Sequence, residues 1–242
     1  MNLSELKQEF QPTLLLPSLT AGLIAAIVTI SMEISLAALI FSGDLNQFLA
    51  GGIGLMLFGA FAVGIVVALL TSLPGAISVP QDTPAAIFAL IAASIALSMK
   101  GAEPKAAYAT LVGTIAITSI ITGAVYLLIA WFKASWFVRY IPYPLIGGFL
   151  AGTGWLLSLG AFGVMANVNL SLSTVPQLFT PDHLLSWIPG LVFAVILLLV
   201  LRKSNHYLIT PGALVIATAL FYGYLFISGI SITEASARGW LL

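Results

Sequence analysis

The chain has 242 residues, of which 60% are hydrophobic and 7% are charged, and its formal net charge at pH 7 is zero. Soluble domains carry about 25% charged residues, so this composition excludes an ordinary soluble protein and indicates an integral membrane protein. The lack of net charge gives no support for a nucleic-acid partner. Cysteine is absent, and His183 and His206 have no second ligand at a useful spacing, so neither a metal nor a cofactor is expected.

Seven apolar stretches predict an all-α membrane protein in which the whole chain, residues 1–242, forms one transmembrane domain. A spanning helix needs about 20 mostly apolar residues. Polar segments or segments rich in proline and glycine separate the stretches, and the longest of these segments, residues 167–182, is expected outside the hydrocarbon. The predicted spans are Leu14–Phe41, Gly52–Ser72, Ala76–Met99, Ala106–Phe132, Phe137–Phe162, Leu184–Leu201 and Thr210–Ile230.

The basic residues favour a cytoplasmic N-terminus, and the membrane that we expect is a plasma (inner) membrane. Cytoplasmic loops carry an excess of Lys and Arg, and aromatic residues gather at the headgroup level. The lipid bilayer is therefore the first partner that we expect. With this orientation Lys7, Lys133, Arg139, Arg202 and Lys203 lie inside, Lys100, Lys105 and Arg238 lie outside, and Trp131, Trp136, Tyr140, Tyr143, Trp187 and Tyr207 fall near the ends of spans.

Two charged side chains, Glu33 and Asp82, lie inside long apolar stretches away from their ends, and both are acids. A charged group at the centre of a membrane helix costs about 2.5–3.5 kcal/mol on insertion scales. Acids found at such depth usually serve a substrate, an ion or a proton. We therefore expect these two residues to be functional.

Glu33 lies near the middle of the first predicted span, among small and hydroxyl-bearing residues. At helical spacing Thr29, Glu33 and Ala37 share one face, with Ser31 and Ser35 to the sides. This stripe predicts a helix that faces a wet cavity, with Glu33 coupling transport to a proton or an ion. The structural alternative is that neighbouring Ser, Thr or backbone groups hold Glu33, which then joins two helices.

Two prolines four residues apart, Pro80 and Pro84, interrupt the third predicted span. They cannot both lie in an unbroken helix, and the residue before a proline prefers extended backbone. We therefore expect a short strand that becomes a half-helix near Thr83, with Asp82 or Thr83 as the N-cap. The N-terminus of a half-helix at the bilayer midplane presents free N–H groups and positive dipole charge to a ligand.

The residues around this break are the predicted substrate-binding residues: Ser78, Gln81, Asp82 and Thr83. Asp82 is also a candidate for ion or proton coupling, together with Glu33. The alternative for Asp82 is that it only caps the helix.

Small residues at helical spacing mark the fifth predicted span. Gly148 pairs with Gly152, and Gly147 pairs with Ala151. Such ridges let helices approach closely, so we expect them to serve packing rather than chemistry.

Three segments resemble the sulfate permease (SulP) family of membrane anion transporters. Leu19-Thr20-Ala21-Gly22-Leu23, with Glu33 and Ala37-Ala38, is similar to the family's first helix. Residues 78–86 are similar to the third helix, in which a short strand joins a half-helix through a Ser/Gly/Pro motif. Residues 139–160, with the core Pro-Tyr-Pro-Leu-Ile-Gly-Gly-Phe, are similar to the fifth helix and carry the most specific match.

The resemblance covers most of residues 13–230 and implies a fold of two inverted seven-helix repeats, whose third and tenth helices meet end to end at the binding site. Seven spans would form one repeat. The family usually ends in a cytoplasmic STAS domain, and this sequence shows neither that domain nor a second repeat. The resemblance therefore implies the N-terminal half of a longer or split transporter, which needs a second half or a homodimer partner.

This sequence departs from the family in three places. The tyrosine-rich signature after the first helix is replaced by Gly43-Asp44-Leu45-Asn46-Gln47, and Leu36 or Ala37 stands in place of the first helix's aromatic residue. Gln81-Asp82-Thr83-Pro84 stands where anion-transporting members have small or hydroxyl residues. Two carboxylates suit a cation, a proton or an amino acid better than sulfate, and an anion would need at least one of them protonated.

The leading interpretation is a secondary active transporter of a small anion, of sulfate or bicarbonate type, coupled to H+ or Na+. The second interpretation keeps the same fold, with a cation or an amino acid as the substrate. The third is a non-transporting membrane subunit. No pair of nucleophile and base is visible, so an enzyme is not expected.

Overall fold

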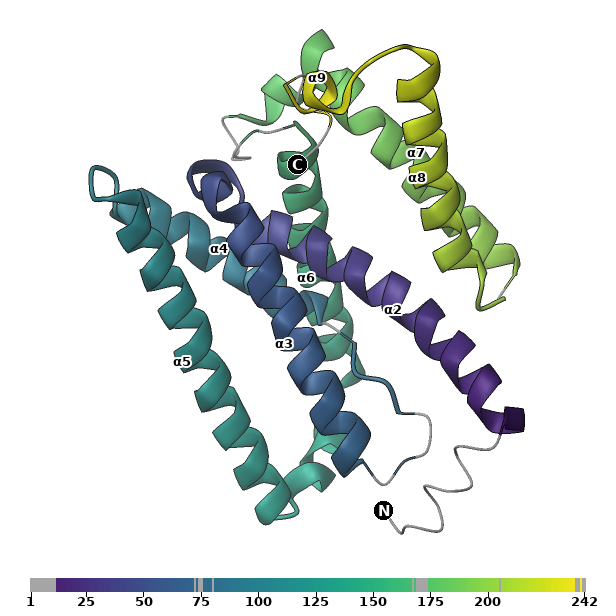
Figure 1. Ribbon diagram of the computed structural model, residues 1–242. Helices are drawn as coiled ribbons and strands as arrows, with labels where there is room; N and C mark the ends of the chain where they lie inside the picture. Colours follow the sequence, from purple (N-terminus) through teal and green to yellow (C-terminus); the bar gives the residue numbers. More distant parts are fainter. Residues whose placement is uncertain are drawn as a thin grey trace. The chain divides into compact units, whose positions relative to one another are not determined.

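The computed structural model describes residues 12–71, 73, 76–79, 81–166, 168, 174–204, 206–237 and 240 (Figure 1). Six of its helices are long and apolar enough to cross a membrane, and a seventh apolar helix is shorter. The prediction of an all-α membrane protein is confirmed at this level. The short strand expected in the third span is not confirmed: the described part of the chain contains no strand, and residues 76–79 belong to no regular element.

The apolar helices follow the predicted spans in order. They are α2 (Pro12–Ile40), α3 (Leu49–Leu70), α4 (Asp82–Ser98), α5 (Pro104–Trp131), α6 (Tyr143–Ala166), α7 (Pro181–Lys203) and α8 (Ile209–Ile227). Shorter elements lie between and after them in the described residues: the 3-10 helices η1 (Gly43–Phe48), η2 (Ala134–Tyr140) and η3 (Val175–Phe179), and the helix α9 (Ile232–Ala237).

The predicted start of the fifth span at Phe137 was wrong. Phe137 lies in η2, and α6 begins at Tyr143. Lys133 adopts a left-handed conformation (φ 50°, ψ 34°) and separates α5 from η2. Ile141 is extended (φ −71°, ψ 120°), as a residue before proline prefers to be, so Pro142 prevents η2 from running on into α6.

The chain divides into two compact units. The first comprises Met1–Ser35, Ile53–Pro80 and Gln177–Leu242, and the second comprises Leu36–Gly52 and Gln81–Pro176. In the first unit α7 and α8 pack side by side (Figure 1). In the second unit α4 packs on both α5 and α6, and α5 also contacts η1 and η2.

The core of the second unit lies around the C-terminal end of α2. Phe41 is fully buried, and its ring centroid lies 5.9 Å from that of Tyr108, which in turn stacks on Phe48 at 4.7 Å. Aromatic pairs at such distances contribute about 0.5–1.5 kcal/mol each beyond the burial of their area. A Cβ at Gly52 would overlap the Phe41 ring, so the backbone of α3 approaches this cluster as closely as only glycine permits.

The small-residue ridge of α6 does not make the close helix contact that we expected. A Cβ placed at Gly147, Gly148, Gly152 or Gly154 meets nothing within 4 Å among the described residues. The close approach on this helix occurs at Gly160, where a Cβ would meet the side chain of Leu39. The ridge itself therefore remains an open strip of helix surface.

Candidate functional site

Glu33 is buried in α2, with 5% of its surface exposed. It lies one helical turn before the buried run Leu36–Phe41 on the same helix, and Ala37, on its own face, has no exposed surface. The predicted face of Thr29, Glu33 and Ala37 is therefore the inward face of α2. Among the described residues, Thr153 is the other buried polar side chain.

The hydroxyl groups beside Glu33 do not hold its carboxyl group. Ser31 Oγ donates a hydrogen bond to the carbonyl oxygen of Ile27 at 2.8 Å, and Ser35 Oγ donates one to the carbonyl oxygen of Ser31 at 2.8 Å. Both serines are thus satisfied within their own helix. The structural alternative, in which neighbouring hydroxyls fix Glu33, finds no support at these two positions.

The carboxyl group of Glu33 forms no hydrogen bond or ion pair with any residue that the structure describes. Within the same residues, no fully enclosed polar side-chain atom lacks a partner, so the Glu33 oxygens must retain part of the small exposed surface. Buried polar groups in proteins are almost always hydrogen-bonded. The Glu33 side chain is largely buried, yet its oxygens keep an exposed edge at which a water, an ion or a ligand can meet them.

The third apolar stretch is interrupted, as predicted. Its helix, α4, begins at Asp82 and has 17 residues, which corresponds to a length of about 26 Å. The hydrocarbon core of a bilayer is about 30 Å thick, so α4 alone is too short to cross it. The residues before it, 76–79, are not helical. Pro80 lies outside the described residues, and Pro84 stands in the first turn, where its missing N–H costs nothing.

The N-cap of α4 is Gln81, one residue earlier than expected. Gln81 is extended (φ −101°, ψ 121°) and its side chain makes no capping hydrogen bond. Asp82 instead acts from the first helical position: its Oδ1 accepts a hydrogen bond from the Thr83 N–H at 2.8 Å and a longer one from the Thr83 hydroxyl at 3.4 Å. This leaves the N–H groups of Gln81 and Asp82 outside the helix's own hydrogen bonds.

Asp82 is exposed and Thr83 is half-buried at this helix start. The helix dipole adds partial positive charge there, which favours an anion, while the Asp82 carboxylate offsets part of it. The geometry therefore offers both backbone donors and a carboxylate to a ligand. The next residues, Ala85 and Ala86, are buried, and they anchor the start of α4.

Ser78 lies on the other side of the break, against α3. A Cβ placed on Gly64 would lie 3.7 Å from Ser78 Oγ, so the serine hydroxyl lies beside Gly64 of that helix. Ser78 belongs to the first unit together with Glu33, whereas Gln81, Asp82 and Thr83 belong to the second. Of the four predicted substrate-binding residues, Gln81, Asp82 and Thr83 therefore lie together at the start of α4.

The burial of Thr153 was not predicted from the sequence. Its side chain is 8% exposed in the middle of α6, which packs on α4. Its hydroxyl donates to the carbonyl oxygens of Phe149 and Leu150, both at 3.1 Å, so it is satisfied within its helix and we assign it no role in the site.

The described residues contain no group of three or more His, Cys, Asp or Glu side chains placed to hold a metal ion. Comparison of the chain with protein-family models, with curated proteins and with solved structures found no match.

Proposed function

We propose that the protein is a secondary active transporter of the sulfate permease type, which moves a small anion such as sulfate or bicarbonate in symport with H+ or Na+. The observation that carries this proposal is Glu33, a buried acid in an apolar helix without a hydrogen-bond partner among the described residues. A buried acid that makes no structural hydrogen bond is suited to take up and release a proton or an ion.

The interrupted third span supports the same function. Irregular backbone within a bilayer persists only where it is buried in protein or lines a cavity. Here such backbone precedes the start of α4, where unpaired N–H groups and dipole charge can receive a substrate. In this proposal Glu33 is the coupling acid, while Ser78, Gln81, Asp82 and Thr83 form one half of the substrate site and Asp82 assists in coupling.

The proposed transporter is completed by a second seven-helix repeat, supplied by a longer chain, a separate half or a homodimer partner. The open ridge of Gly147, Gly148 and Gly152 on α6 supports this, because small residues at this spacing accept a neighbouring helix. The protein would reside in a plasma membrane with its N-terminus in the cytoplasm.

A second candidate function keeps this arrangement and makes the substrate a cation or an amino acid. The observation that favours it is the Asp82 carboxylate, which is exposed at the start of α4 and offsets the dipole charge that an anion would use. The two candidates differ in the charge of the solute that competes for the site.

Competition uptake separates the two candidates. In proteoliposomes that contain the full-length gene product, sulfate or bicarbonate is expected to be taken up under an inward H+ or Na+ gradient and to compete better than arginine or lysine. Asp82→Ser should retain or strengthen competition by sulfate or bicarbonate, because it removes a negative charge beside the helix dipole, and it should weaken the dependence of uptake on the gradient, because Asp82 assists in coupling. Asp44→Ser, which removes an exposed acid from η1, is the matched control and should change nothing.

Competition by arginine or lysine, with Asp82→Ser switching uptake from cation to anion, would favour the second candidate. If none of these four solutes is taken up under either gradient, the proposed function is wrong.

A further inference from the structure

A group of aromatic and basic side chains surrounds the connection between α5 and α6. We call it the η2 surface. Its aromatic members are largely exposed, from 47% for Trp136 to 83% for Trp131, and nearby Tyr143 is 85% exposed. The η2 surface comprises Trp131, Lys133, Trp136, Phe137, Arg139 and Tyr140.

Within the η2 surface the aromatic rings hold a cation in place. Trp136 stacks on Phe137 at 4.2 Å and meets Tyr140 edge-on at 5.5 Å. Arg139 Cζ lies 5.7 Å from the Trp136 ring centroid and 5.6 Å from that of Tyr140. These are cation–π distances, so the guanidinium group is fixed between two rings while its N–H groups remain available as donors.

The two positive charges of the η2 surface are not neutralised within the described residues. Neither Lys133 nor Arg139 forms an ion pair there, and the sequence contains no Asp or Glu between Glu103 and Asp182. Lys133 occupies the left-handed position that ends α5, a place where glycine is usual. The η2 surface is therefore suited to bind a negatively charged partner.

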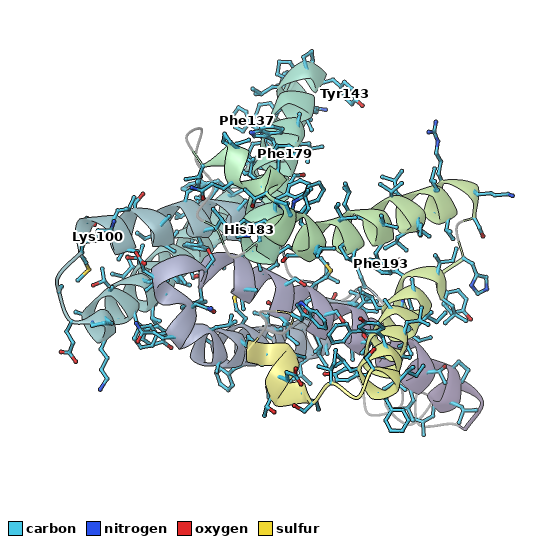
Figure 2. All side chains as sticks on the ribbon, turned by 90° about the horizontal axis from the view of Figure 1, so that it is seen from above. Lys100, Phe137, Tyr143, Phe179, His183 and Phe193 are labelled. Atoms are coloured by element: carbon cyan, nitrogen blue, oxygen red, sulfur yellow. The ribbon has the colours of Figure 1, made fainter. Side chains whose placement is uncertain are left out.

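The place of η2 in the chain indicates what this partner is. It joins α5 to α6, both long and apolar enough to cross a membrane, so it lies where two spanning helices leave the hydrocarbon. Figure 2 shows Phe137 and Tyr143 near this connection and Lys100 well away from them. Tryptophan and tyrosine concentrate at the headgroup level, and basic residues there attract anionic lipids.

We propose that the η2 surface binds the phosphate headgroup of an anionic phospholipid. Arg139, held between Trp136 and Tyr140, donates hydrogen bonds to the phosphate oxygens, and Lys133 adds a second charge. The exposed rings lie against the glycerol and the first methylene groups of the same lipid. A soluble phosphate would use the two charges but not the rings, which is why we assign the site to a lipid.

Native mass spectrometry of the purified chain tests this assignment, with phosphatidylglycerol and phosphatidylcholine as probes. The wild type should bind phosphatidylglycerol more tightly. Each basic residue near an anionic surface contributes about a five-fold gain in affinity, so the double variant Lys133→Asn/Arg139→Gln should lose roughly 25-fold for phosphatidylglycerol. It should lose much less for phosphatidylcholine, whose choline cation offsets the charge of its phosphate. Asparagine is chosen at residue 133 because it tolerates the left-handed conformation.

The matched control is Lys100→Gln/Lys105→Gln, which removes two charges at the opposite end of α5 and should leave phosphatidylglycerol affinity unchanged. An unchanged melting temperature shows that the η2 variant is folded. Millimolar inorganic phosphate should not displace the lipid; displacement would assign the site to a soluble anion instead. Equal loss in both double variants, or no preference of the wild type for phosphatidylglycerol, would overturn the proposal.

Discussion

Replacing Glu33 with glutamine is expected to reduce gradient-driven uptake roughly tenfold or more, while the protein still inserts and folds. Glutamine keeps the shape of the side chain but cannot release a proton or carry a negative charge at neutral pH. Uptake of the labelled substrate in proteoliposomes, measured with and without an imposed H+ or Na+ gradient, gives the result. Glu103→Gln, an acid before α5 with no capping hydrogen bond, is the control and should leave uptake unchanged.

The same variant distinguishes coupling from a structural role. Because no described residue donates a hydrogen bond to the Glu33 carboxyl group, Glu33→Gln should not lower the melting temperature. If Glu33 joined two helices through such bonds, the substitution would weaken them or leave them unpaired, and the protein would lose about 1–3 kcal/mol of stability. Unchanged gradient dependence of uptake in Glu33→Gln would rule out the coupling role.

Gly52→Ala is expected to destabilise the protein strongly. The added methyl group would overlap the ring of Phe41, which is fully buried and packed against Tyr108. Because the ring has no free space to enter, either it or the backbone of α3 must move, and such overpacking costs about 1–3 kcal/mol. The melting temperature, followed by tryptophan fluorescence in detergent, should fall by about 5 °C.

Gly54→Ala is the matched control in the same helix. A Cβ at Gly54 meets nothing within 4 Å, so this substitution should be neutral or raise stability by up to about 1 kcal/mol through helix propensity. Equal melting temperatures for Gly52→Ala and Gly54→Ala would contradict the close packing of α3 against Phe41.

The helices of this protein were predictable from hydropathy, because a spanning helix satisfies its own backbone and needs only length and apolar residues. The break before α4 was predictable for an equally local reason, the steric effects of Pro80 and Pro84. The shared helical face of Thr29, Glu33 and Ala37 was predictable from helical spacing. Each of these predictions depends on a residue and its near neighbours along the chain.

Features that depend on distant residues were not predictable. The contacts of Phe41 and Phe48 with Tyr108, and of Leu39 with Gly160, join residues more than 50 positions apart, and helical periodicity does not identify such partners. The ridge around Gly148 was predicted to pack, yet its spacing alone cannot say which helix would cover it. The start of α6 was misplaced because hydropathy runs through η2, whereas the left-handed Lys133 ends α5 before it.

In the proposed transporter, solvent and solute reach the break before α4 within the membrane. The chain contains no cysteine, so single cysteines can be placed at will. In intact proteoliposomes, Ser78→Cys and Thr83→Cys should react with a charged methanethiosulfonate reagent about tenfold or more faster than Ile120→Cys, because a thiol against lipid does not ionise; Ile120 is 72% exposed on α5. Substrate should slow both reactions. Rates at Ser78→Cys and Thr83→Cys as low as that at Ile120→Cys would contradict a transport site at this break.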